Sequence, residues 1–241
     1  MRKNKQFWEW VLYEFFQNRC IFCNDVILPL TLCCEKCRGD MAVIKAPICS
    51  YCGRNKQDCS CHKQRHAYDA VAAPFYYTGA VQQGLLRLKR YDDPHALSFF
   101  AEQMTAVIRR EYPQLPFDAI VYVPMHVKAQ RKRDYNQSEL LAAEVALRTG
   151  LPVQPCLVKR YETKPQKALN RTQRLGNVLG VFDVEGRVFG QRLLLIDDVV
   201  TTGASAHECA KVLKICGAKS VTVLAVAVTA PKTEEENGCK P

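Results

Sequence analysis

The sequence predicts an α/β fold with a parallel sheet, preceded by a small cysteine-rich module. From about residue 69, apolar segments of strand length alternate with segments of helical periodicity. Nine of the thirteen cysteines fall between Cys20 and Cys61. The apolar segment 193–196 leads directly into two acids and a Thr-Thr-Gly turn. With 241 residues, of which 48% are apolar, the chain has room for one full domain and a small module.

The elements are expected in the following order. An amphipathic helix at 5–17 precedes the cysteine-rich region, and the module as a whole is assigned to 1–66. The α/β domain is assigned to 67–230, and a polar tail to 231–241. We expect strands at 69–77, 119–124, 155–159, 179–184, 193–197 and 220–228, and helices at 79–90, 94–112, 137–149 and 203–216.

Composition and charge exclude several classes of protein. No uninterrupted apolar stretch approaches the roughly 20 residues that a membrane helix needs. The N-terminus is basic, but Glu9, Glu14 and Gln17 interrupt the apolar run of a signal peptide. We therefore expect a cytoplasmic protein. Its net charge of +10 favours polyphosphate or nucleic-acid ligands.

The cysteine pattern indicates structural zinc sites. In a reducing compartment, clustered cysteines favour metal thiolates over disulfides. A two-residue spacing lets both thiolates of a pair reach one tetrahedral Zn²⁺, and two pairs complete a closed site without an open catalytic position. A crossed pairing stays open, as does substitution by Cys33 or His62. We expect one or two structural zinc ions. The simplest assignment is sequential, with Cys20, Cys23, Cys34 and Cys37 in one site and Cys49, Cys52, Cys59 and Cys61 in the other.

The turn after segment 193–196 has the features of a ribose-phosphate site. In an open parallel sheet, ligands bind beyond the carboxyl ends of the strands. There the backbone N–H groups of a Thr/Gly-rich turn and the following helix N-terminus can bind an anion. Paired acids suit vicinal ribose hydroxyls and can help to hold Mg²⁺. The residues concerned are Asp197, Asp198, Thr201, Thr202, Gly203, Ala204 and Ser205.

This segment, IDDVVTTGAS, resembles the motif by which type I phosphoribosyltransferases bind 5-phosphoribosyl 1-pyrophosphate (PRPP). The resemblance implies that Asp197 and Asp198 contact the ribose, while 201–205 surround the 5-phosphate. It also implies that the loop after strand 119–124 grips pyrophosphate, through Met125, His126, Lys128, Arg131 and Arg133. A second basic loop occupies the place of the mobile hood that closes over PRPP, and its cations are Lys164, Lys167, Arg171 and Arg174.

The whole assembly resembles the ComF/GntX family of bacterial competence proteins. Matching segments are the cysteine pairs, GLLRLKRYDD, VPMHVKAQRKRDYNQSELLA, the stretch 166–182 and IDDVVTTGAS. Where the family usually reads Arg-Gly-Phe-Asn-Gln, this chain has Asp134 and Tyr135 in place of the glycine and phenylalanine. Membership implies a role in natural transformation at the cytoplasmic side of the inner membrane, with single-stranded DNA as a ligand and a helicase-like partner.

The resemblance indicates PRPP as the phosphoribosyl donor but does not identify the reaction. Transfer of phosphoribose from PRPP to an acceptor is the enzyme hypothesis, but no acceptor can be read and no residue is assigned as a general base. A DNA-handling module that binds PRPP without catalysis is the binding-module hypothesis. A nucleotide-salvage phosphoribosyltransferase and a PRPP-sensing regulator without a DNA role are the alternatives.

Overall fold

The structure, a computed structural model, describes residues 18–231 except 29, 60, 62–65, 92, 126–134 and 161–179. The expected helix at 5–17, His62, the basic residues of both loops and the tail beyond 231 lie outside the described residues. Among those described, no helix is both long and apolar enough to cross a membrane.

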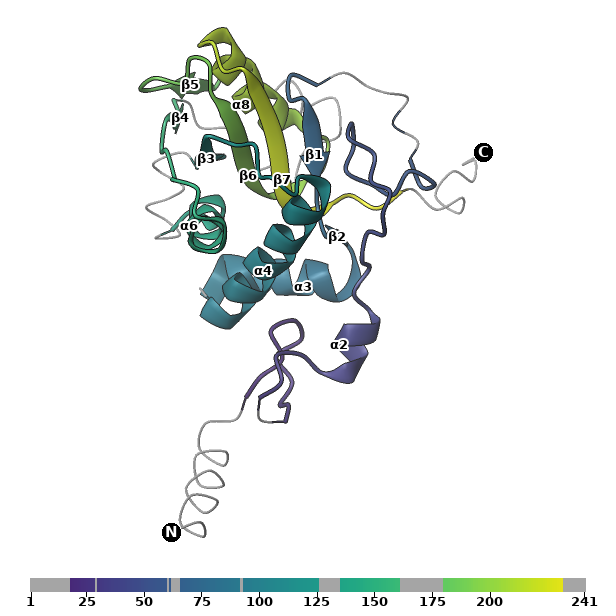
Figure 1. The fold of residues 1–241 in the computed structure, drawn as a ribbon. Coiled ribbons are helices and arrows are strands. Elements are labelled where there is room, and N and C mark those ends of the chain that lie inside the picture. Colours follow the sequence, from purple (N-terminus) through teal and green to yellow (C-terminus); the bar gives the residue numbers. More distant parts are fainter. Residues whose placement is uncertain are drawn as a thin grey trace, which may run out of the picture.

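A parallel sheet forms the centre of the molecule (Figure 1). Its strands are β1 (Ala70–Ala72), β2 (Phe75–Tyr76), β3 (Ala119–Tyr122), β6 (Arg192–Val200) and β7 (Ser220–Val228). The order is β1-β7-β6-β3, with β2 also paired to β7, and every pairing is parallel. The α/β fold class with a parallel sheet is therefore confirmed.

Helices cover both faces of this sheet (Figure 1). Helices α4 (Pro94–Glu111) and α6 (Gln137–Thr149) pack on one face, and α3 (Gly79–Tyr91) packs against α4. Helix α8 (Ala204–Ile215) packs on the other face. The crossover rule accounts for this division, because a right-handed connection places its helix according to the direction in which the chain moves across the sheet.

Three strand expectations need correction. The expected strand 69–77 is divided into β1 and β2, with Ala73 and Pro74 between them. The strand expected at 193–197 continues as β6 to Val200, so the turn begins only at Thr201. The segments near 155–159 and 179–184 form β4 (Leu157–Lys159) and β5 (Phe182–Val184), which pair with each other antiparallel and stay outside the parallel sheet.

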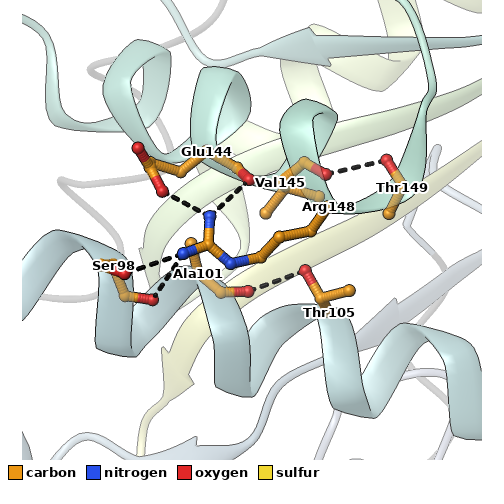
Figure 2. Close-up of polar contacts among 7 residues, drawn as sticks. All are labelled: Ser98, Ala101, Thr105, Glu144, Val145, Arg148 and Thr149. Carbon is orange, nitrogen blue, oxygen red and sulfur yellow. Dashed lines mark hydrogen bonds and ion pairs between the residues drawn. The ribbon is translucent and has the colours of Figure 1, made fainter.

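Polar contacts of Arg148 join helix α6 to α4 (Figure 2). Arg148 forms an ion pair with Glu144 in its own helix, and its Nη2 donates to the Ser98 hydroxyl at 2.8 Å. Asn136 caps the other end of α6, where its Oδ1 accepts the Ser138 N–H at 3.1 Å. The last turn of α6 is thus tied to α4, and its N-terminus lies at the carboxyl edge of the sheet, where Asn136 Nδ2 donates to the Val123 carbonyl after β3.

The cysteine-rich module shares its core with the sheet domain. Phe22 is fully buried and lies edge-to-face against Phe99 and Phe100 of α4. Gly84 of α3 makes this approach possible, because a Cβ at that position would lie 2.6 Å from Phe22 Cδ1. The short helix α2 (Glu35–Gly39) packs near α3, below the sheet in Figure 1.

Candidate functional site

The carboxyl ends of β3 and β6 form one wall of a cavity of about 220 Å³. Because the two strands are parallel and adjacent, the residues that follow them lie at the same edge of the sheet. Helix α6 begins there, and α3 and β4 each contribute a lysine. The lining residues are Lys89, Val123, Pro124, Met125, Asn136, Gln137, Ser138, Lys159, Asp197, Asp198, Val199 and Ser205.

Both predicted acids lie in this cavity. Asp197 is 8% exposed, and its Oδ1 accepts the Ser138 hydroxyl at 3.4 Å and the Asp198 backbone N–H at 2.8 Å. Burial and the neighbouring charge of Asp198 raise the pKa of Asp197 well above its ordinary value, while Lys89 acts in the opposite direction. Burial therefore disfavours a second negative charge on this pair, and a cation or hydroxyl donors bound there would favour it.

Lys89 is a residue of the site that sequence reasoning did not single out. Its ammonium forms an ion pair with Asp198 Oδ2. Although burial lowers it, the pKa of Lys89 is raised on balance by Asp198, which keeps the ammonium charged. A signal was present in the sequence, because Val81, Leu85 and Leu88 define the buried side of α3 and Lys89 follows at the same helical period.

Replacing Lys89 is expected to destabilise the protein because both acids would lose their counter-charge. We expect Lys89→Met to lower the free energy of unfolding at pH 7 by about 2 kcal/mol, as for a broken, partly buried ion pair. Lys89→Arg should keep most of the stability. The measurement is urea unfolding in a double-mutant cycle with Asp198→Asn. If the two substitutions prove additive, the ion pair does not contribute as described.

The N-terminus of α6 supplies the polar side of the cavity. Asn136 Nδ2 donates to the Val123 carbonyl at 3.1 Å, which ties α6 to the end of β3. The next residue, Gln137, is buried, and its Nε2 has no hydrogen-bond partner among the described residues. This amide is thus available to an acceptor atom of a ligand. The Tyr135 hydroxyl donates to the Leu88 carbonyl at 2.9 Å and holds α3 beside α6.

The predicted anion-binding turn follows β6. Gly203 has a φ of +74° and, as the N-cap of α8, offers no side-chain acceptor to the first backbone N–H groups of that helix. Thr202 Oγ1 accepts one of them, the Ala204 N–H, at 3.4 Å. Of the turn residues, Ser205 reaches the cavity that holds the two acids. The helix N-terminus and the acids therefore lie at one edge of the sheet.

The two basic loops are described only where they leave the sheet. Met125 lines the cavity, whereas His126, Lys128, Arg131 and Arg133 lie outside the described residues, as do Lys164, Lys167, Arg171 and Arg174. The β4–β5 hairpin is the base from which the second loop extends. At the end of β4, Lys159 lines the cavity with its Nζ 5.6 Å from the centre of the Phe182 ring. Burial lowers the pKa of Lys159.

The eight predicted zinc ligands form two groups in sequential order. Within each group the sulfur atoms all lie within 4.8 Å of one another. Tetrahedral zinc with Zn–S bonds of about 2.3 Å requires sulfur atoms about 3.8 Å apart, and Cys23–Cys34 at 3.7 Å and Cys49–Cys61 at 3.9 Å fit this spacing. The sequential assignment thus agrees with the structure. Cys33 is outside both groups.

The two clusters begin with the same loop. The Cys20 N–H donates to the Asp25 carbonyl at 2.8 Å, and the Cys49 N–H donates to the Arg54 carbonyl at 2.7 Å. In each loop the residue after the second cysteine has a positive φ, 71° for Asn24 and 74° for Gly53. These residues fit zinc in both clusters.

Metal analysis tests both clusters. We expect two zinc ions per chain, because each group supplies four thiolates to a closed tetrahedral site. Cys34→Ser and Cys59→Ser should each reduce the zinc content to about one ion per chain. Atomic absorption spectroscopy provides the measurement, and Cys156→Ser, outside both groups, is the control. A wild-type zinc content below one ion per chain would contradict the assignment.

The fold and the site define a class of protein with two parts. A parallel α/β domain carries an acidic pair before a Thr-Thr-Gly turn, and two four-cysteine clusters pack against this domain. Competence protein F of Haemophilus influenzae is 26% identical over 229 residues, which cover 90% of this chain and 99% of that protein. Competence protein ComFC of Streptococcus pneumoniae is 29% identical over 193 residues, 78% of this chain and 84% of that protein. These similarities confirm the resemblance to the ComF/GntX family.

A shorter similarity reaches another named group. DNA utilization protein YhgH of Salmonella typhimurium is 36% identical over 111 residues, 46% of this chain and 48% of that protein. No protein-family model matches the chain.

Solved structures are similar to part of the chain. Adenine phosphoribosyltransferase from Saccharomyces cerevisiae is 14% identical, with a TM-score of 0.37 and coverage of 57% of this chain and 71% of that one. The PRPP amidotransferase of B. subtilis is 20% identical, with a TM-score of 0.37 and coverage of 54% and 26%.

Proposed function

We propose that the chain binds PRPP with Mg²⁺ in the cavity at the end of β6 and acts in DNA uptake during natural competence. The observation that carries the proposal is the convergence of two acids, two lysines and a helix N-terminus on one cavity. Such a site offers acceptors to hydroxyl groups and donors to phosphate groups at the same time. PRPP presents both kinds of group.

In this proposal the ribose of PRPP lies against the two acids. The carboxylates of Asp197 and Asp198 accept hydrogen bonds from the vicinal ribose hydroxyls, and the N–H groups of 202–205 bind the 5-phosphate. Lys89 and the Gln137 amide face the same cavity and donate to oxygen atoms of the pyrophosphate. The pyrophosphate contacts expected of the two basic loops complete the site.

The acidic pair also suits a magnesium ion. Carboxylate oxygens are hard ligands, and Mg²⁺ keeps several waters while it bridges carboxylates and substrate phosphates. When bound, the ion would neutralise charge on the pyrophosphate. In a transfer reaction the C1–oxygen bond to pyrophosphate breaks, an acceptor atom forms the new bond at C1, and pyrophosphate leaves with the electron pair. The acceptor is not assigned.

Calorimetric titration tests the binding proposal. We expect PRPP with Mg²⁺ to bind more tightly than ribose 5-phosphate or inorganic pyrophosphate alone, because each fragment satisfies only half of the site. Omission of Mg²⁺ should weaken PRPP binding. If PRPP does not bind, or if pyrophosphate alone binds as tightly as PRPP, the assignment of the site is wrong.

The competence role rests on the named relatives and on the positive charge of the chain. The relatives are called competence and DNA utilization proteins, and the net charge is +10. We propose that the protein binds single-stranded DNA on the cytoplasmic side, with a helicase as the partner that the family resemblance implies. The logarithm of the binding constant should then fall with the logarithm of salt concentration, with a slope of about −0.7 for each phosphate contact. A salt-independent affinity would contradict DNA binding.

A further inference from the structure

The second cysteine cluster lies directly against the end of the sheet. The Ser50 carbonyl accepts the Val71 N–H of β1 at 2.9 Å. A Cβ on Gly53 would lie 3.0 Å from Val228 Cγ1, at the last residue of β7. In Figure 1 the chain after α2 runs beside β1 and β2. The loop Cys49–Arg54 is therefore in contact with the strand that neighbours β6.

A chain of hydrogen bonds continues from this loop to the anion-binding turn. Arg54 Nε donates to the Thr229 carbonyl at 2.9 Å. The Thr229 N–H donates to the Val200 carbonyl at 3.1 Å, and its hydroxyl donates to the Thr201 carbonyl at 3.3 Å. Thr229 thus joins the loop of the second cluster to the first residue of the turn.

A second line of contacts reaches the turn from the segment after Cys61. The Tyr68 hydroxyl is buried against Gly203, where it lies 2.8 Å from the position that a Cβ would occupy. His66 is stacked on Tyr68 with ring centres 4.6 Å apart. The Ala67 N–H donates to His207 Nδ1 in the first turn of α8 at 3.0 Å. Gly203 is required here twice, by its positive φ and by the approach of Tyr68.

The first cluster has different neighbours. Its Phe22 packs against Gly84 of α3 and against Phe99 and Phe100 of α4. The loop itself carries a comparable arginine, because Arg19 Nη1 donates to the Asn24 carbonyl at 3.1 Å within the same loop. The two clusters are therefore alike in their own geometry and differ in what they contact.

We propose that the second four-cysteine cluster holds the anion-binding turn in its binding conformation, through Arg54 and Thr229 on one side and Tyr68 on the other. Arg54, Thr229 and Tyr68 are positioning residues, since they act on the turn and do not touch the ligand. Ligand affinity at the turn then depends on metal in the second cluster and not on metal in the first. The affinity part of this inference rests on the proposed PRPP site, whereas the order of the turn does not.

Two matched pairs of variants test the hydrogen-bond chain in the full-length, zinc-loaded protein. Thr229→Val removes the hydroxyl and should weaken PRPP binding about fivefold, the equivalent of one hydrogen bond of about 1 kcal/mol. Thr229→Ser keeps the hydroxyl and should bind as the wild type does. Arg54→Ala should weaken binding by a similar factor, and Arg19→Ala, in the corresponding loop of the first cluster, should not.

Hydrogen exchange provides a readout that needs no ligand. We expect the amides of 201–207 to exchange faster in Thr229→Val and in Cys59→Ser, and to stay unchanged in Thr229→Ser and in Cys34→Ser. If the wild type does not bind PRPP, the proposed function fails and the exchange rates alone decide the positioning role. Unchanged exchange of the turn in Thr229→Val and Cys59→Ser would overturn the inference. So would equal PRPP affinities of Thr229→Val and Thr229→Ser.

Discussion

The double substitution Asp197→Asn with Asp198→Asn is expected to weaken Mg²⁺-dependent PRPP binding by at least about 100-fold, since each charged hydrogen bond contributes about 1.5–3 kcal/mol. Asparagine keeps the volume of each side chain, but it removes the charge that attracts Mg²⁺ and weakens both acceptors. The measurement is calorimetric titration with PRPP. Asp118→Asn is the control, because Asp118 pairs with Arg192 at the opposite end of β6. Unchanged PRPP affinity in the double variant would refute the assignment of the acids.

Although loss of the two acids should weaken ligand binding, Asp197→Asn alone is expected to stabilise the ligand-free protein. The pKa of Asp197 is raised in the folded protein, first by burial and then by Asp198. A carboxyl whose pKa is raised in the folded protein makes its full contribution to stability only below its unfolded pKa of about 3.9. This contribution is lost as the pH rises through the pKa of the folded protein. At pH 7, Asp197→Asn should therefore raise the melting temperature of the ligand-free protein. A lower melting temperature would contradict the raised pKa.

Phe22→Ala is expected to have the largest effect on stability, a loss of about 3–5 kcal/mol in the free energy of unfolding. The ring is fully buried between α3 and α4, so its removal leaves a cavity between the cysteine module and the sheet domain. Because Phe22 and the strands of the sheet belong to the same core, a single unfolding transition should shift as a whole.

Urea unfolding followed by both circular dichroism and zinc release measures this effect. Leu30→Ala is the control in the same module, since Leu30 is 100% exposed and its replacement should change stability by less than about 0.5 kcal/mol. Two separate transitions in Phe22→Ala, with the second at the wild-type midpoint, would contradict a shared core.

The sequence predicts helix α6 and strand β7 with the bounds that the structure has. Both have local boundary signals, since Asn136 and Gly150 flank α6 and Gly217 precedes β7. Such signals act whatever the tertiary context. The zinc ligands are equally local, because each pair closes within four residues. The acids and the turn are contiguous in the sequence, so their pattern can be recognised without knowledge of the fold.

Features that depend on long-range contacts could not be derived in this way. The position of β7 between β1 and β6 follows from pairings that no local pattern specifies. The antiparallel β4–β5 pair depends on contacts across the segment 160–181. The ion pair of Lys89 with Asp198 joins α3 to β6 across more than one hundred residues, and helical periodicity can indicate only that Lys89 faces inward.

The different roles that we propose for the two four-cysteine clusters also could not be predicted from the sequence. The two cysteine loops share a spacing and a hydrogen-bond pattern, so the sequence treats them as equivalent. In the structure the first contacts Gly84 and the second contacts Val228. Their different neighbours are the reason to assign them different roles.

A crystal structure grown with PRPP, Mg²⁺ and a short single-stranded oligonucleotide tests the central claim most directly. We expect the ribose hydroxyls within hydrogen-bond distance of Asp197 and Asp198, and the 5-phosphate on the N–H groups of 202–205. Lys89 should have moved from Asp198 to the ligand or to the metal-bound pyrophosphate. A ligand bound elsewhere, or a cavity that holds the Lys89–Asp198 ion pair unchanged at saturating PRPP, would contradict the proposed site.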